Sequence, residues 1–136
     1  MRNHLGKRID EIKRLIGNDK VKEYMTNNPC AVSLDFSIKQ AAELFIKTEA
    51  EIIMVVDKSE RLIGAVTKSS LIQHLINQLP TDSGVKHVML SPIISISAND
   101  PLAKAFQYPF QRLPVVDDQG KLVGLLNYTD LLGSYV

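Results

Sequence analysis

Hydrophobic and polar positions follow one another along the chain in short blocks that predict strands and amphipathic helices. Residues 52–56 form a continuous apolar run, which is typical of a buried strand, and residues 61–66 follow a polar turn as its expected hairpin partner. Apolar residues recur at helical spacing from Ile38, and Ser37 with Gln40 forms the signature of a capping box at that helix start. The expected order is strand, helix, strand, strand, helix, beginning near residues 31, 38, 52, 61 and 67.

The second half of the chain repeats this order. Its expected strands are residues 93–96, 113–116 and 121–126. Asp100-Pro101 predicts a helix start, with Asp100 as the cap and Pro101 at the first helical position. Pro109 ends that helix early, and the last helix is expected to begin near Asn127 and to run to the chain end.

Two copies of one unit account for this pattern. A shift of 64 residues places Met25 on Met89, and further along a shift of 60 places Val55-Val56-Asp57 on Val115-Val116-Asp117. The second copy has therefore lost four residues, about one helical turn, between Ala105 and Val115. The expected division is an N-terminal extension at 1–20, a first repeat at 21–78 and a second repeat at 85–136.

The N-terminal extension reads as an amphipathic helix. Its apolar stripe consists of Leu5, Ile9, Ile12 and Ile16, and its other face is mostly basic. One interpretation is a helix that packs its stripe on the repeats and leaves its charged face in solvent. The other is a connector or docking helix for a partner.

Composition and charge exclude several classes of function. The 136 residues carry a formal net charge of +1, which predicts no strong attraction to nucleic acid or membranes. No apolar run is long enough to span a bilayer, and Cys30 is the single cysteine, so we expect a cytoplasmic protein. Neither a metal-ligand spacing nor a phosphate-binding loop nor a catalytic constellation is recognisable, so we do not expect an enzyme.

The repeat resembles a CBS domain pair, also called a Bateman module. The stretches that carry the resemblance are "YMTNNP" at 24–29, "VMLSP" at 88–92 and "RLPVVDDQGKLVGLLNYTDLL" at 112–132. The resemblance implies an α/β (α+β) fold in which tandem β-α-β-β-α repeats pack as a pseudo-twofold sandwich, here preceded by the N-terminal helix. It also implies a homodimer and a regulatory, non-catalytic role in signal transduction. Such a module senses an adenosine-containing ligand such as adenosine, AMP, ADP, ATP or S-adenosylmethionine, with no catalytic cofactor.

Thr129-Asp130 is the strongest candidate for ligand binding. A carboxylate can accept charge-assisted hydrogen bonds from two neighbouring ribose hydroxyls, and the resemblance gives Asp130 this role. A second interpretation stays open, because Asn127 is a good helix cap and an acid three residues later suits the helix dipole.

The resemblance implies two clefts, each built from both repeats. The first cleft would combine Leu125, Asn127, Thr129 and Asp130 with Cys30, Ala31, Ile52 and Ile53. In it Cys30 would be a wall residue beside an adenine and not a nucleophile. The second, weaker cleft would combine Thr67, Ser69 and Ser70 with Ile93, Ile94, Arg112 and Leu113.

The charged residues are divided unequally between these two clefts. Ser70 stands where the second copy has Asp130, so the second cleft lacks the ribose-binding acid. Arg112 would offer a phosphate cation to that cleft, whereas Glu51 near the first cleft would repel a phosphate chain. This distribution argues against tight ATP binding at either cleft.

Two functions compete on these residues. The first is a ligand-sensing module that passes a conformational change to a regulated protein or a fused effector domain. The second is a ligand-free module for dimerisation or protein interaction, which Ser70, Glu51 and the shortened helix favour.

Overall fold

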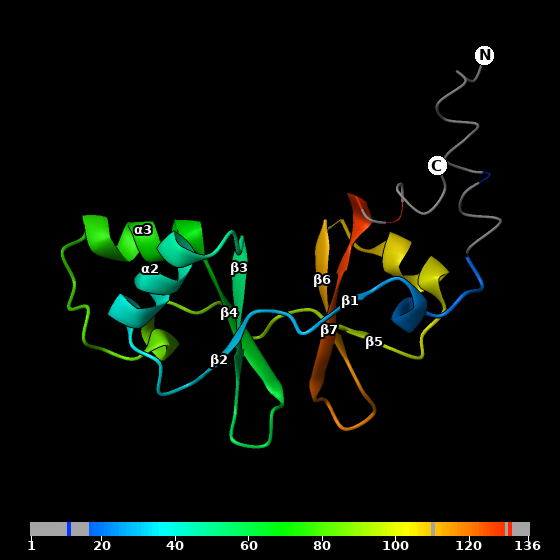
Figure 1. The fold of residues 1–136 in the computed structure, drawn as a ribbon, viewed down its shortest axis with the longest axis horizontal. Coiled ribbons are helices and arrows are strands. Elements are labelled where there is room, and N and C mark those ends of the chain that lie inside the picture. The colour runs from blue at the N-terminus through cyan, green and yellow to red at the C-terminus, as the bar shows by residue number, and fades with distance from the viewer. Residues whose placement is uncertain (1–10, 12–16, 110, 130, 132–136) are drawn as a thin grey trace, which may run out of the picture. The chain divides into compact units, whose positions relative to one another are not determined.

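Two sheets, each with its own buried apolar core, make up the part of the chain that the computed structural model describes (Figure 1). The described residues are 11, 17–109, 111–129 and 131. They divide into unit 1, which takes its described residues from Met1–Asn28, Ser95–Asp118 and Val123–Val136, and unit 2, which holds Pro29–Ile94 and Gln119–Leu122. The chain has a mixed α/β architecture. The N-terminal helix predicted within 1–20 falls mostly at residues 1–10 and 12–16, outside the described residues, and the described residues 17–20 are not helical.

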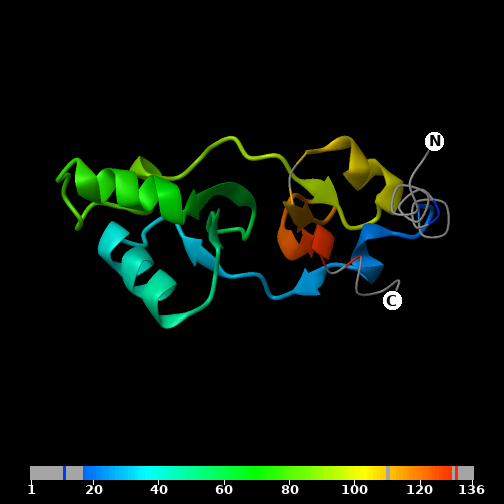
Figure 2. The ribbon, with the colours of Figure 1, turned by 90° about the horizontal axis from the view of Figure 1, so that it is seen from above.

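Unit 2 is a three-stranded sheet with two helices on one face (Figures 1 and 2). Its elements are β2 (Ala31–Ser33), α2 (Ile38–Lys47), β3 (Ile52–Val56), β4 (Leu62–Thr67), α3 (Lys68–Ile76) and the 3-10 helix η2 (Val85–His87). β3 is the central strand, parallel to β2 and antiparallel to β4. The strand predicted at 52–56 is confirmed as this buried central strand, because Ile53, Met54 and Val55 each expose at most 1% of their surface.

Unit 1 is a four-stranded sheet in the order β1-β7-β6-β5. Its elements are the 3-10 helix η1 (Val21–Glu23), β1 (Thr26–Asn27), β5 (Ile96–Ser97), the 3-10 helix η3 (Leu102–Gln107), β6 (Arg112–Val116) and β7 (Leu122–Asn127). β5 runs parallel to β6, and β1 pairs antiparallel with β7. The prediction of a strand at 93–96 is wrong about where the strand begins, because only Ile96 and Ser97 pair with β6.

Both helices of unit 2 begin with reciprocal side-chain caps. The Ser37 hydroxyl accepts from the Gln40 backbone N–H at 3.0 Å, and the Gln40 side chain accepts from the Ser37 N–H at 2.9 Å. The predicted capping box is confirmed, and it fixes the start of α2. Thr67 and Ser70 form the same kind of box at the start of α3.

Each unit contains the opening segment of the other repeat. Thr26 of the first repeat pairs with Leu125 in unit 1, and Leu90 of the second repeat pairs with Ala65 in unit 2. The Leu90 N–H donates to the Ala65 carbonyl at 2.7 Å, and the Ala65 N–H donates back at 3.1 Å. The shifts of 64 and 60 residues superpose these two pairings, so the exchange is a property of the repeat itself.

The segment Gly17–Lys20 has the same role in unit 1 as the linker Thr81–Gly84 has in unit 2. The carbonyls of Gly17 and Asp19 accept from the first N–H groups of η3, at 2.8 and 2.6 Å. The carbonyls of Thr81 and Ser83 accept in the same way from α2, both at 2.9 Å. A helix start leaves free N–H groups, and here a preceding chain segment supplies their acceptors.

The helix predicted at Asp100-Pro101 begins one residue later than expected and is a 3-10 helix. Pro101 is extended and occupies the cap position, not the first helical position. The Asp100 carboxylate turns back to the Ser97 N–H at 3.1 Å and pairs with Lys104 at 3.3 Å, so it does not cap the helix. The helix ends at Gln107, before Pro109, as the proline requires.

Candidate functional site

The predicted adenine-facing residues lie together at one end of the unit 2 sheet. The Met54 N–H donates to the Cys30 carbonyl at 2.8 Å, which fixes Cys30 and Ala31 beside β3. Ile52 pairs with Thr67 on the adjacent strand. Ile53 is fully buried, so its side chain belongs to the core and no part of the residue is exposed at the sheet surface.

Cys30 is half-buried and packs against the core of unit 2. This burial raises the pKa of the Cys30 thiol above its ordinary value. A thiol needs a lowered pKa to be a good nucleophile near neutral pH. The environment therefore favours an unreactive thiol, and the role of Cys30 as a wall residue beside an adenine stays a prediction.

The hydroxyl of Ser70 is engaged within its own helix start. It donates to the Thr67 carbonyl at 3.0 Å and accepts from the Thr67 N–H at 3.2 Å, while the Thr67 hydroxyl accepts from the Ser70 N–H at 3.1 Å. A serine has one hydroxyl proton, and this one is already donated. Thr67 and Ser70, which were predicted for the second cleft, therefore bond to each other and cap the start of α3. Ser69, which lies between them in the sequence, is exposed.

Asn127, which corresponds to Thr67 in the repeat, also bonds to the start of a helix in unit 1, but its partner is Thr129. The Asn127 side-chain oxygen accepts from the Thr129 N–H at 3.2 Å and from the Thr129 hydroxyl at 2.9 Å. Asn127 therefore caps the last helix, as one of the two interpretations of this stretch predicts. Asp130 lies outside the described residues, so its ribose-binding role stays a prediction.

The other predicted site residues differ in how far their side chains are exposed to solvent. Leu125 is half-buried, and its carbonyl accepts from the Thr26 hydroxyl at 3.0 Å. Leu113 is buried, whereas Arg112 beside it is exposed. Ile93 is half-buried and Ile94 is exposed.

The charge distribution in unit 2 differs from the sequence expectation at Glu51. Its carboxylate lies 3.5 Å from the ammonium group of Lys68, at the start of α3. Both side chains are about half exposed, so the pair contributes little to stability. The pair does change the electrostatics, because a cation accompanies the acid that we expected to repel phosphate.

Each predicted cleft takes residues from both units, so the pairing of residues across units stays a prediction. Unit 2 contributes Cys30, Ala31, Ile52, Ile53, Thr67, Ser69, Ser70, Ile93 and Ile94. Unit 1 contributes Arg112, Leu113, Leu125, Asn127 and Thr129. In the described ranges, no group of three His, Cys, Asp or Glu side chains could hold a metal ion.

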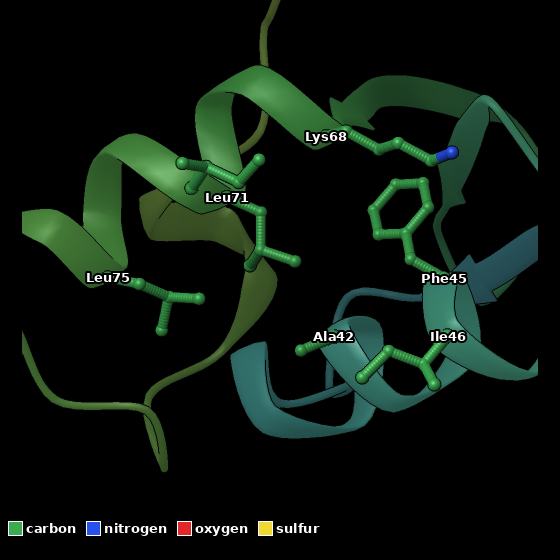
Figure 3. Close-up of a pocket in the computed structure, with 7 residues that line it drawn as sticks. Ala42, Phe45, Ile46, Lys68, Leu71 and Leu75 are labelled. Carbon is green, nitrogen blue, oxygen red and sulfur yellow. The ribbon is translucent and has the colours of Figure 1, made fainter.

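A groove between α2 and α3 is a feature that the sequence interpretation did not place. It has a volume of about 280 Å³ and is lined by Ala42, Phe45, Ile46, Lys68, Leu71, Ile72 and Leu75. Figure 3 shows Phe45 and Ile46 of α2 facing Leu71 and Leu75 of α3 across it. Exposed isoleucines at helical spacing were the signal that could have indicated it.

Comparison with known proteins agrees with the repeat. The model of the CBS domain family matches residues 21–77 and 85–136. An inosine-5'-monophosphate dehydrogenase from Nitrosopumilus maritimus is 33% identical over 112 residues, which are 81% of this chain and 23% of that enzyme. The chain spans about a quarter of the length of the curated relatives that it matches first.

Solved structures share the fold. CBSX2, a protein from Arabidopsis thaliana, was solved in complex with AMP, and that chain is 26% identical with a TM-score of 0.72. The match covers 85% of this chain and 95% of that one. The CBS domain pair of protein MJ0100, solved with 5'-methylthioadenosine and S-adenosylmethionine, has a TM-score of 0.69 at 23% identity and covers 85% and 94% of the two chains. No helix in the described part of this chain is long and apolar enough to cross a membrane.

Proposed function

Because the chain belongs to the CBS domain family and carries two tandem copies as a CBS pair, we propose that it is a regulatory module that senses an adenosine-containing ligand. The observation that carries this proposal is the AMP complex of CBSX2, whose chain matches this one over 85% of its length. In this proposal ligand binding changes the arrangement of the repeats, and a partner protein or fused domain responds to that change.

The proposed binding residues are those of the Asp130 cleft. Asp130 would accept hydrogen bonds from the ribose hydroxyls, and Thr129 would help to position it. Cys30, Ala31 and Ile52 would form an apolar wall for the adenine, with backbone groups available at its edge. Lys68, which pairs with Glu51, cancels the repulsion that this acid alone would exert on a phosphate, so an adenosine ligand with one phosphate is compatible with this cleft.

The second candidate function is a ligand-free interaction module. The observation in its favour is that Ser70 and Thr129 both donate their hydroxyl protons within helix starts. Neither hydroxyl is then free to donate to a ligand without breaking a local bond. The two candidates differ in one measurable property, which is the affinity for adenosine compounds.

Calorimetric titration with adenosine, AMP, ADP, ATP and S-adenosylmethionine tests the proposal. We expect one of these ligands to bind the wild type, and Asp130→Asn to weaken it at least about tenfold, which corresponds to about 1.4 kcal/mol. Asp82→Asn is the matched control, because it neutralises an exposed acid in the linker and should leave the affinity unchanged. Absence of binding at millimolar ligand would contradict sensing and favour the interaction module.

A substitution that introduces an acid into the second cleft gives a further test of the proposal. Ser70→Asp places an acid at the position that corresponds to Asp130 in the other copy. If the two clefts are related by the repeat, this variant should gain a second binding event or tighter binding at the second cleft. An unchanged titration would show that the acid is not the feature that separates the two clefts.

A further inference from the structure

We propose that Met25 and Met89 form a matched pair of oxidation sites, one in each unit, at which hydrogen peroxide adds oxygen to the sulfur and loosens the exchanged segment that follows the methionine. The exchanged segments are β1 (Thr26–Asn27) in unit 1 and residues 90–91 in unit 2. This inference does not rest on ligand sensing, and it applies to the chain without any nucleotide.

The two methionines occupy equivalent positions and are held by equivalent backbone bonds. The shift of 64 residues superposes them. The Met25 N–H donates to the Val21 carbonyl at 3.1 Å, and the Met89 N–H donates to the Val85 carbonyl at 2.9 Å. Val21 and Val85 are both fully buried, so each methionine follows a turn that is anchored in the core of its own unit.

Each sulfur lies directly against the backbone of a strand, at a glycine. A Cβ atom at Gly64 of β4 would lie 2.9 Å from the Met89 Sδ, and one at Gly124 of β7 would lie 2.5 Å from the Met25 Sδ. Real Cβ atoms essentially never approach a neighbour within 3.0 Å, so no further atom fits between the sulfur and the strand. The unbranched, adaptable thioether suits this position because it can follow the surface of the strand.

Exposure separates these two methionines from Met54. Met25 and Met89 are half-buried, so part of each residue faces solvent on the side that the strand does not cover. Met54 exposes only 1% of its surface, in the middle of the central strand β3. An oxidant must reach a sulfur before it can oxidise it, and we therefore expect Met25 and Met89 to react before Met54.

The chemical step needs only hydrogen peroxide as the oxidant. A lone pair of the sulfur attacks one peroxide oxygen, the O–O bond breaks and the S–O bond forms. The proton on the transferred oxygen passes to the departing hydroxide, which leaves as water, so the sulfur loses two electrons and the peroxide gains them. Reversal by a sulfoxide reductase takes two electrons from a dithiol, which becomes a disulfide, and the oxygen leaves as water.

The sulfoxide is larger and more polar than the thioether, and it forms beside an apolar core. Met25 packs against the core of unit 1, and Met89 packs against the core of unit 2. A polar S–O group at such a place costs free energy unless it turns toward water. Because the strand leaves no room on its own side, this turn draws the next residue away from the strand. In unit 2 that residue is Leu90, whose two bonds with Ala65 measure 2.7 and 3.1 Å.

Peroxide treatment of the folded chain, followed by peptide mass spectrometry, tests where oxidation occurs. We expect Met25 and Met89 to form sulfoxide several-fold faster than Met54. Fragment ions assign each added oxygen to a methionine or to Cys30. The same treatment in urea is the control, since the three methionines should react at similar rates once the chain is unfolded.

Amide hydrogen exchange of the oxidised chain tests the structural consequence. Exchange at Leu90 and Ala65 should become at least about tenfold faster, because each amide then loses its acceptor. The Ala41 amide, which bonds to Ser37 at the start of α2, is the control and should exchange as before. Equal acceleration at all three amides would show a general loss of stability and would contradict a local release.

Substitution of the sulfurs connects the two measurements. The double variant Met25→Leu with Met89→Leu should lose the exchange response to peroxide, and Met54→Leu is the matched control that should keep it. Circular dichroism establishes that each variant is folded, and the measurements on the wild type decide the question if the double variant is not. Oxidation of Met54 as fast as the other two in the folded chain would overturn the proposal. So would an oxidised wild type whose Leu90 and Ala65 amides exchange at their original rates, or a folded double variant that still responds.

Discussion

The hydroxyl of Tyr128 donates a hydrogen bond to the backbone carbonyl of Ala105. Tyr128 starts the last helix, and Ala105 lies near the end of η3, where the second repeat is four residues shorter than the first. The same hydroxyl lies 3.2 Å from the Tyr108 carbonyl. The Ala105 carbonyl also accepts from the Tyr108 N–H at 3.1 Å, so the side chain of Tyr128 adds a second donor at the end of η3, where the second repeat is shorter.

Substitution of this tyrosine gives the first prediction. Tyr128→Phe keeps the ring but removes the hydroxyl's bond to the Ala105 carbonyl, which then keeps only the Tyr108 N–H at 3.1 Å, so the free energy of unfolding should fall by about 1 kcal/mol. Urea denaturation followed by circular dichroism measures this change. Tyr108→Phe is the control, since Tyr108 is also a half-buried tyrosine of unit 1. Equal losses in the two variants would show that the Tyr128 hydroxyl has no special role.

Local patterns were sufficient to predict much of this fold. The apolar run at 52–56 forms β3 over the same residues, and Ser37 with Gln40 forms the predicted box. Both follow from interactions between near neighbours in the chain or from burial of a whole strand. The internal repeat was equally visible, because two copies of one unit share their apolar positions.

Features that depend on distant backbone groups could not be predicted. The start of η3 is fixed by carbonyls of Gly17 and Asp19, and any residue type can offer a carbonyl. The exchange of Thr26 and Leu90 between repeats likewise depends on backbone pairing. At the site, the sequence identified the capping role of Asn127 as one alternative but gave no indication that Lys68 reaches Glu51.

The exchanged segment in unit 2 requires a glycine, which gives the second prediction. A Cβ atom at Gly64 would lie 2.8 Å from the Leu90 carbonyl oxygen and 2.9 Å from the Met89 sulfur. Leu90 is held there by its two bonds to Ala65, so the backbone cannot withdraw without losing them. Gly64→Ala should therefore lower the free energy of unfolding by about 1–3 kcal/mol, measured by urea denaturation.

Gly84→Ala is the matched control for that experiment. A Cβ atom at Gly84 would have its nearest neighbour at 3.5 Å, the Leu34 carbonyl oxygen, which is an ordinary contact. Its unfolding free energy should stay within about 0.5 kcal/mol of the wild type. If Gly64→Ala were as mild as this control, the close approach of Leu90 would be readily relaxed.

The third prediction concerns alkaline pH. The Tyr24 hydroxyl donates to the Asp19 carboxylate at 2.7 Å, and this bond, with burial and the nearby negative charge, raises the pKa of Tyr24 from 10.0 to about 12. The folded state therefore keeps this proton more tightly than the unfolded state. The associated stabilisation is complete below pH 10 and is lost as the pH rises through about 12.

Ultraviolet absorbance of the phenolate measures that titration. Tyr24→Phe should remove a transition with a midpoint at about pH 12 from the titration of the folded protein. Asp19→Asn is the control variant, because it keeps an oxygen acceptor but removes the charge, and the pKa of Tyr24 should then move back toward 10.0. An unchanged titration in Asp19→Asn would contradict the role of the carboxylate.

The fourth prediction is the reactivity of Cys30, which lies in the predicted adenine wall. Burial raises the pKa of its thiol, so less thiolate is present near neutral pH and alkylation by iodoacetamide should be several-fold slower than for a free thiol. Mass spectrometry follows the rate, and the same measurement in urea is the control, since unfolding should restore the ordinary rate. Saturating AMP should slow alkylation further if the adenine lies against Cys30. A native rate equal to the rate in urea would mean that the thiol is not shielded, and the apolar wall would have to be assigned to other residues.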